Sequence, residues 1–210
     1  MEPLLETFCL ENKQLFHLKY HQDRVRWSTG QEIDISLFTE AIKSNPSYTL
    51  AQKGKWRVSV TYSPSSILSI RFVPYQVPEI GLLKPTTIKE NFYSYKWADR
   101  SQFESIKKEL PRGTEPLFIL DGLVTDTSFT NVVLEKNGQL FTPKSYLLKG
   151  TKRCCLLDKG IIHECDITLE DLRHYDTIHL VNAMLSPHQL TLPIEAVSYT
   201  HLRAHETPEH

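Results

Sequence analysis

Short runs in which apolar and polar residues alternate, each bounded by turn-forming residues, restrict the fold of this chain more than any other feature. Residues 56–62 and 67–72 alternate with period two on either side of a Ser-Pro-Ser-Ser segment, which predicts a β-hairpin. Residues 132–135 and 139–142 flank Asn137-Gly138, a dipeptide preferred in two-residue hairpin turns. Antiparallel strand pairs are therefore expected in both halves of the chain.

Helical patterns accompany the strands in the first half. Residues 4–10 and 14–18 are extended runs, and residues 17–28 show an amphipathic helical face that ends before Gly30. Asp34 precedes a second apolar helical set and is predicted to be its N-cap. The first part of the chain is therefore expected to be a small α+β unit.

The second half repeats this mixture after a predicted linker. Gly81 to Thr87 is expected to be the linker, because Gly81 and Pro85 interrupt the periodicity. Beyond it we expect helices at 101–110 and 150–159, strands at 116–120 and 178–181, and a capping-type helix start at Thr168. The fold class is α+β, with a small N-terminal domain at 1–84 and a larger domain at 85–196.

Composition limits the partners. The 24 basic and 25 acidic side chains give a net charge of −1, which argues against a nucleic-acid binder or a polybasic membrane arm. No stretch approaches the ~20 apolar residues that a membrane span requires, and no basic segment precedes an apolar run at the N-terminus. The chain is expected to bind neither nucleic acid nor membrane.

Cysteine and histidine spacing indicates a reduced protein without a metal site. The four cysteines suit neither a disulfide framework nor a zinc site, and the histidines of the second half stand at no metal-ligand spacing with Cys or Asp. A cytoplasmic location is therefore expected. The residues concerned are Cys9, Cys154, Cys155, Cys165, His163, His174, His179 and His188.

Four segments could carry chemistry, although each has an ordinary explanation when taken alone. Lys96 lies between two aromatic residues and could simply extend over them at the surface. His21 and Arg24 share a helix face that could be solvated. Residues 126–131 are a run of side-chain hydrogen bonders typical of a turn, and residues 150–153 open a helix whose free N–H groups could bind an anion or only water.

The order of these pieces is more specific than any one of them. The chain carries, in sequence, His21-x-x-Arg24, Lys96 with Asp99-Arg100 behind it, Asp126 four residues before Thr130-Asn131, Thr142-Pro143, and Leu147-Leu148-x-Gly150-x-x-Arg153. This arrangement resembles the class IV aminotransferases, the fold type IV pyridoxal-phosphate enzymes. The resemblance runs from Glu6 to about Ile194 and implies a small α+β domain followed by a larger, barrel-like mixed domain.

The resemblance also implies a cofactor, pyridoxal 5'-phosphate, and roles for particular residues. Lys96 is the expected catalytic residue, which forms the Schiff base with the cofactor and moves the proton at the reacting carbon. Asp126 stands where the family places a carboxylate, usually Glu, against the pyridine nitrogen. The shorter Asp must approach the ring more closely or act through a water.

The remaining expected cofactor-binding residues contact the phosphate. Arg24 corresponds to the family's phosphate-binding arginine. Thr151 and Lys152 lie at the matching helix N-terminus, where backbone N–H groups favour an anion although the side chains depart from the family pattern. Asn182 and Ala183 resemble the last phosphate-binding turn.

Three functions remain open. The residues after Lys96 and those around Asn182 are more similar to aminodeoxychorismate lyases, which release pyruvate to give 4-aminobenzoate, than to branched-chain aminotransferases. The arginine-containing strand of those lyases is represented only by residues 71–75. The alternatives are an amino-acid aminotransferase of the branched-chain or D-amino-acid type, with the same Lys96 chemistry, and a non-catalytic family member that acts as a binding protein.

The resemblance implies a homodimer that acts on a small-molecule amino substrate. Residues 197–210 lack periodicity and are similar to a translated sequencing adapter, so a non-native or disordered tail is expected there.

Overall fold

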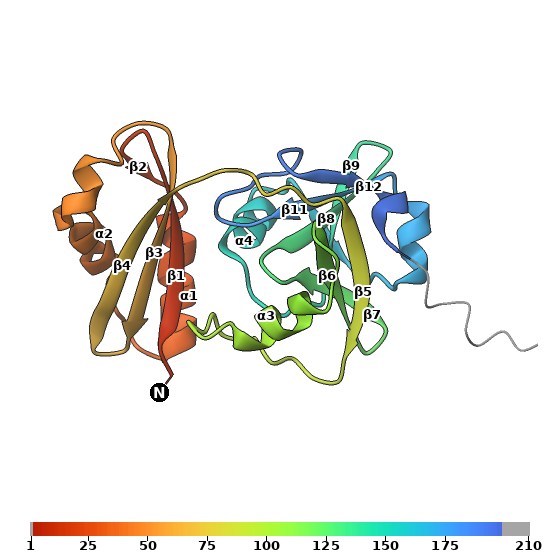
Figure 1. The fold of residues 1–210 in the computed structure, drawn as a ribbon, viewed down its shortest axis with the longest axis horizontal. Coiled ribbons are helices and arrows are strands. Elements are labelled where there is room, and N and C mark those ends of the chain that lie inside the picture. Colours follow the sequence, from red (N-terminus) through yellow and green to blue (C-terminus); the bar gives the residue numbers. More distant parts are fainter. Residues whose placement is uncertain (1, 199–210) are drawn as a thin grey trace, which may run out of the picture.

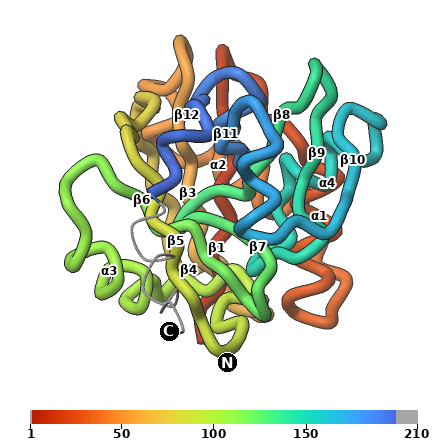
Figure 2. Tube along the Cα trace, turned by 90° about the vertical axis from the view of Figure 1, so that its right-hand side faces the viewer, coloured from red at the N-terminus to blue at the C-terminus, as the bar shows by residue number. Residues whose placement is uncertain are grey.

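The protein, seen here in a computed structural model that describes residues 2–198, has two lobes side by side. Figure 1 shows the N-terminal lobe, with its sheet and two helices, beside a C-terminal lobe built around a larger, curled sheet. Viewed along the long axis, the strands of the second lobe curve around a common centre (Figure 2). Among the described residues, no helix is long and apolar enough to cross a membrane.

The first lobe is an antiparallel sheet covered on one face by helices. Its strands are ordered β2-β1-β3-β4, and Val58, Val60 and Tyr62 turn buried side chains toward the helices. The alternate residues of the same strand face the second lobe. The elements are β1 (Leu4–Glu11), β2 (Gln14–Leu15), α1 (Leu18–Thr29), α2 (Ile35–Ser44), the 3-10 helix η1 (Pro46–Thr49), β3 (Lys55–Ser63) and β4 (Ser66–Pro74).

The cap, the helix end and the hairpin that the sequence predicts in this lobe are present in the structure. The Asp34 carboxylate accepts a hydrogen bond from the backbone N–H of Ser36, which confirms the predicted N-cap of α2. Helix α1 ends at Gly30, whose φ of 67° is available to glycine at little cost. The predicted hairpin is the β3–β4 pair, with a register shift at Thr61/Tyr62.

The second lobe is an eight-stranded mixed sheet. Its main path runs β10-β9-β8-β7-β6-β5, while β11 pairs with β8 and β12. The elements are β5 (Leu82–Ile88), α3 (Ser101–Lys108), β6 (Thr114–Leu120), β7 (Leu123–Thr127), β8 (Asn131–Lys136), β9 (Gln139–Pro143), α4 (Thr151–Asp158), β10 (His163–Cys165), η2 (Glu170–His174), β11 (Thr177–Val181), β12 (Thr191–Pro193) and η3 (Ile194–Ala196).

Turn signals in this lobe are also confirmed. Asn137 and Gly138, with φ of 51° and 74°, join β8 to β9 as the dipeptide predicts. Thr168 and Asp171 exchange side-chain to backbone hydrogen bonds at the start of η2, which is a 3-10 rather than an α-helix.

The linker prediction is wrong for residues 82–87, which belong to strand β5. This strand pairs in parallel with β6 and lies at the edge of the sheet, where Pro85 can be tolerated because one side of the strand needs no donor. The segment between the sheets is instead 75–81, and the expected boundary at residue 84 falls inside β5.

The predicted tail begins too early. Val197 is buried, forms a bridge with Leu83, and is followed by Ser198, whose N–H donates to the Leu83 carbonyl. The remainder of the predicted tail, residues 199–210, lies outside the described residues.

The large core of the second lobe sets its stability, and Leu134 on β8 is fully buried within it. Leu134→Ala should lower the free energy of unfolding by about 2–5 kcal/mol, because it removes buried methyl groups and leaves a cavity. Urea unfolding measures this, with Leu50→Ala as the control, since Leu50 is 77% exposed. Equal effects of the two substitutions would show that Leu134 is not in a packed core.

Candidate active site

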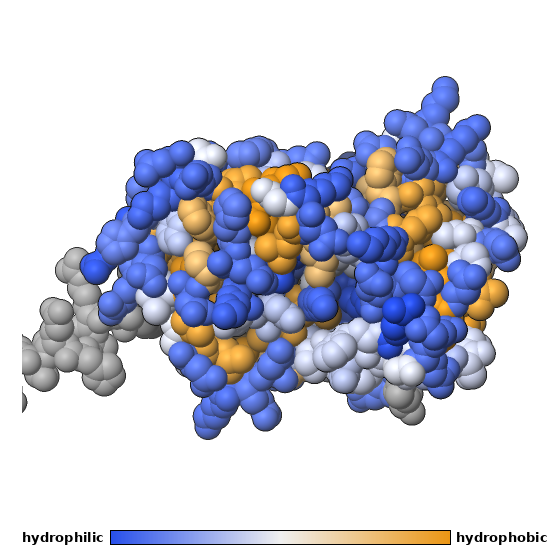
Figure 3. Space-filling view, turned by 180° about the vertical axis from the view of Figure 1, so that it is seen from behind, coloured by the Kyte–Doolittle hydropathy of each residue, from blue (hydrophilic) through white to orange (hydrophobic). Residues whose placement is uncertain are grey.

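A cavity of about 720 Å³ lies between the two lobes. The polar face of the first sheet forms one wall, and the second sheet, the start of α4 and the turn after β11 form the others. Seen from behind, hydrophilic residues gather along the junction of the lobes (Figure 3). Six of the seven residues expected at the site line this cavity, namely Arg24, Lys96, Asp126, Thr151, Asn182 and Ala183.

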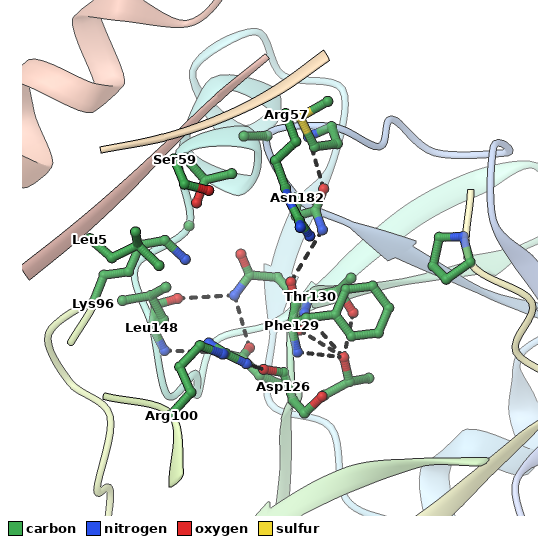
Figure 4. Close-up of a pocket in the computed structure, with 18 of the residues that line it drawn as sticks. Leu5, Arg57, Ser59, Lys96, Arg100, Asp126, Phe129, Thr130, Leu148 and Asn182 are labelled. Atoms are coloured by element: carbon green, nitrogen blue, oxygen red, sulfur yellow. Dashed lines mark hydrogen bonds between the residues drawn. The ribbon is translucent and has the colours of Figure 1, made fainter. Parts of the chain in front are cut away.

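Lys96 reaches the cavity from a loop that is fastened to the first sheet. The Lys96 carbonyl accepts from the backbone N–H of Leu5, and the Ala98 N–H donates to the Pro3 carbonyl, both at 2.8 Å. Figure 4 shows the Lys96 side chain entering the cavity. Desolvation, together with the nearby positive charges of Arg24 and Arg100, lowers the pKa of Lys96 to about 7. Its amine is therefore partly neutral near neutral pH, as a nucleophile or proton acceptor must be.

Arg24 is held by the buried Glu6, which in turn contacts the buried His21. Its Nε and Nη2 donate to the two oxygens of Glu6 at 2.8 and 2.6 Å. Burial would raise the pKa of Glu6, but the charge of Arg24 and the contact with His21 together lower it to about 2. Burial also lowers the pKa of His21, so a neutral ring donates from Nδ1 to Glu6 at 2.5 Å. Glu6 thus compensates the charge of Arg24 and occupies one edge of its guanidinium group, which leaves Nη1 for a ligand.

Asp126 lies where the second sheet divides. Asn131, at the start of β8, pairs with Asp126 on β7, whereas from Leu134 onward the same edge of β8 pairs with β9. The Asp126 carboxylate accepts from Asn131 Nδ2 at 2.9 Å and from the N–H groups of Leu147 and Leu148 at 3.0 and 2.9 Å. Desolvation outweighs these hydrogen bonds and raises the pKa of Asp126 to about 6. The ionised carboxylate, with about four acceptor sites, keeps one free toward the cavity.

The N-terminus of α4 faces the cavity without a side-chain cap. Gly150 is the N-cap residue, and the buried Thr151 follows it. The first N–H groups of a helix lack internal partners and carry a partial positive charge, so they favour a bound anion. A Cβ on Gly150 would stand 1.8 Å from Asn131 Oδ1, and glycine is therefore required for α4 to approach the Asp126–Asn131 pair.

The turn after β11 is shaped by Asn182. Its Nδ2 donates to the Phe129 carbonyl at 3.2 Å, and its Oδ1 accepts from the N–H groups of Met184 and Leu185. The Asn182 amide therefore organises the turn, so a ligand would meet the half-buried turn at Ala183, which lines the cavity, rather than this side chain.

The structure does not bring the Lys152 side chain to the cavity. The Lys152 ammonium donates to Ser186 Oγ at 3.1 Å. It lines a separate pocket of about 350 Å³, which His17 also lines. Residues that follow one another on a helix point in different directions, so only the backbone N–H of Lys152 is available at the start of α4.

Sequence reasoning missed several cavity residues. The sequence gives no signal for Arg57 on β3, and Arg71 on β4 belongs to the segment that represents the lyases' arginine-containing strand, yet both line the cavity. Arg100 donates from Nη1 to Tyr93 Oη at 3.1 Å and from Nη2 to the Ser128 carbonyl, so it ties the Lys96 loop to the second sheet. The alternation of β3 marks Arg57 as lying on its polar face, but it gives no information on what that face opposes.

A second polar cluster lies outside the cavity. Glu135, His179 and His188 bring their ligand atoms within 4.8 Å of one another, although the spacing of the histidines had predicted no metal site. His179 Nε2 contacts Glu135 Oε2 at 3.0 Å, and Nδ1 contacts Thr191 Oγ1 at 2.7 Å. Both ring nitrogens of His179 thus have protein partners, as in a satisfied structural histidine.

Comparisons with known proteins give the class of this fold. Residues 113–191 match the family "Amino-transferase class IV". An uncharacterized protein of Haemophilus influenzae is 30% identical over 190 residues, which are 88% of this chain and 98% of that protein.

Solved structures agree with this class. A crystal structure from Haemophilus somnus 129pt, described as "a putative 4-amino-4-deoxychorismate lyase", is 30% identical with a TM-score of 0.77, and the match covers 88% of this chain and 97% of that one. A PLP-bound hypothetical aminotransferase from Mycobacterium tuberculosis shares the fold at 18% identity and a TM-score of 0.74, with 94% and 81% covered. The chain belongs to the class IV aminotransferase family, and its fold is that of the fold type IV pyridoxal-phosphate enzymes.

The low pKa of Lys96 predicts that its amine reacts at a lower pH than the amine of an ordinary lysine. In ligand-free protein, reductive methylation of Lys96 by formaldehyde should increase as pH rises through about 7 and then level off, because the neutral amine is the reactive form. Peptide mass mapping measures this, with the exposed Lys43 as the internal reference. A rate at Lys96 that keeps increasing toward about pH 10, as for an ordinary lysine, would contradict the account.

Gly150 can be tested by adding one methyl group. Gly150→Ala should lower the free energy of unfolding by about 1–3 kcal/mol, because the new Cβ displaces Asn131 from Asp126. Gly81→Ala is the matched control, since a Cβ there meets nothing within 4 Å. Thermal or urea unfolding compares the two, and a Gly150 variant as stable as the Gly81 variant would show that α4 does not pack as described.

Proposed function

We propose that this protein is a pyridoxal-phosphate-dependent lyase that releases pyruvate from 4-amino-4-deoxychorismate. The observation that carries the proposal is the half-buried Lys96, an amine with its pKa lowered to about 7 in the same cavity as Asp126 and the uncapped start of α4. The similarity to the Haemophilus somnus protein over nearly its whole length supports the choice of reaction.

The residues of the cavity fit this cofactor. The N–H groups at Thr151 and Lys152, the free Nη1 of Arg24 and the turn at Ala183 would bind the phosphate. The remaining acceptor site of Asp126 would bind the protonated ring nitrogen, and Lys96 would hold the cofactor covalently. When bound, pyridoxal phosphate supplies an electron sink that stabilises negative charge at the reacting carbon.

Each residue then has a defined task in the reaction. Asp126 keeps a negative charge beside the ring nitrogen, where buried charge has a strong effect. The substrate amine would replace Lys96 on the cofactor, which frees Lys96 Nζ to remove the proton from the ring carbon that carries this amine. A pKa near neutral suits both taking and returning a proton. The C–O bond to the enolpyruvyl group breaks, the leaving oxygen gains a proton, and the products are 4-aminobenzoate and pyruvate. No oxidant and no keto-acid acceptor are consumed.

The comparisons establish the family, and the lyase reaction, the homodimer and the cytoplasmic location remain proposals. An aminotransferase would use the same Lys96 but would need a keto acid to accept the amino group. The requirement for an acceptor therefore separates the two reactions.

Product assays with cofactor-loaded protein test the proposal. From 4-amino-4-deoxychorismate, wild-type protein should form 4-aminobenzoate and pyruvate in equal amounts without an added keto acid. Lys96→Ala should lower the rate at least about 100-fold, because it removes the proton-transfer group.

Lys108→Ala is the control, because this exposed lysine at the end of α3 lies outside the cavity. Amino transfer that occurs only when a keto acid is added would replace the lyase by an aminotransferase. Neither reaction, with no difference between wild type and Lys96→Ala, would leave the non-catalytic alternative.

A further inference from the structure

The first sheet presents two arginines to the cavity on one face. Ser59 on β3 lies directly opposite Arg71 on β4, so their side chains share a face. Arg57 is two residues from Ser59 on the same strand and is therefore a diagonal neighbour of Arg71, with Cβ atoms about 7 Å apart. Thr61 and Ser69, the next pair on this face, are small and leave room in front of the arginines.

These two guanidinium groups are the uncompensated charges of the cavity. Among residues 2–198, neither Arg57 nor Arg71 forms an ion pair or a side-chain hydrogen bond, and the cavity's exposed Glu104 forms no ion pair with either. The other cationic side chains on its wall are engaged or assigned. Arg24 binds Glu6, Lys107 binds Glu115 at 2.6 Å, Arg100 binds Tyr93 and Ser128, and Lys96 is the reacting amine.

An exposed arginine on a polar strand face is usually solvated, but this face is opposed by the second lobe. Arg57 also lies close enough to Lys96 for its charge to contribute to the lowered pKa of that amine. In Figure 4, Arg57 extends toward Asn182, and Asp126 lies lower in the view. An anion held by these arginines would therefore sit in the same cavity as the reacting amine.

We propose that Arg57 and Arg71 bind two carboxylates of one substrate, so that the enzyme selects amino compounds that are dicarboxylates. This inference rests on the proposed function, because it assigns the substrate side of the same cavity. Guanidinium groups bind carboxylates through short, charge-assisted hydrogen bonds, often with two parallel contacts. A dicarboxylate can give each arginine a carboxylate of its own, whereas a monocarboxylate must leave one arginine unpaired or be shared between the two.

Binding of substrate-like acids without an amino group tests the inference on cofactor-loaded protein. The probes are isophthalate, an aromatic dicarboxylate, and benzoate, its monocarboxylate counterpart, and calorimetry measures both affinities. Wild type should bind isophthalate at least about 10-fold more tightly than benzoate. Arg57→Gln and Arg71→Gln should each weaken isophthalate about 10- to 100-fold and largely remove this preference.

Arg112→Gln is the matched control, because Arg112 is exposed in the turn before β6 and lies outside the cavity. It changes the charge equally and should leave both affinities as in wild type. Cofactor content, measured by visible absorption in every variant, should be unchanged.

Three results would overturn the inference: equal binding of the two probes by wild type, an unchanged preference in both glutamine variants, or loss of cofactor from those variants. The last would assign the arginines to the cofactor phosphate. If wild-type protein takes up no cofactor, the proposed function fails, and the preference between the two acids still decides the role of the arginines.

Discussion

The removal of one lysine amine from water, at the junction of two lobes, is the constraint on which the rest of this site depends. Lys96 belongs to the loop between β5 and α3 of the second lobe, yet its backbone is hydrogen-bonded to β1 of the first. This attachment places the amine among Arg24, Arg57 and Arg100 and lowers its pKa to about 7. Neither lobe alone would create this environment, because the neighbouring charges come from both.

Two charged side chains of the cavity, Arg24 and Asp126, are stabilised in different ways. Glu6 compensates the charge of Arg24 and is itself contacted by His21, so a buried ion pair supports the wall of the cavity at Arg24. Asp126 accepts three hydrogen bonds and forms no ion pair among residues 2–198, which leaves its charge available at the cavity. The close approach of Gly150 to Asn131 brings the start of α4 beside this carboxylate. The contact between Gly150 and Asn131 therefore determines both how α4 packs and how close its N-terminus lies to the charge of Asp126.

Sequence reasoning succeeded where a signal is local. The Asp34 cap and the Asn137-Gly138 turn depend on residues next to one another, and both were found. It failed where a partner strand decides the outcome. Pro85 indicates a break when read alone, but an edge strand needs no donor on its free side, so residues 82–88 still form β5.

The same distinction holds for the site. The resemblance selected Lys96, Asp126 and Arg24, which the structure brings to one cavity. It could not show that the Lys152 side chain points elsewhere, or that Glu6 occupies one edge of Arg24. Arg57 carries no motif, and Arg71 stood only in the segment that represents the lyases' arginine-containing strand. That both face the cavity follows from the face of the first sheet that opposes the second lobe.

The central claim is that Lys96 holds pyridoxal phosphate covalently between the lobes. Borohydride reduction of the cofactor-loaded protein, followed by peptide mass mapping, tests this most directly. The account predicts one reduced pyridoxyl-phosphate group per chain, attached to the peptide that contains Lys96, and no such adduct in Lys96→Ala. An adduct on another lysine, or none in wild-type protein that has been supplied with the cofactor, would contradict it.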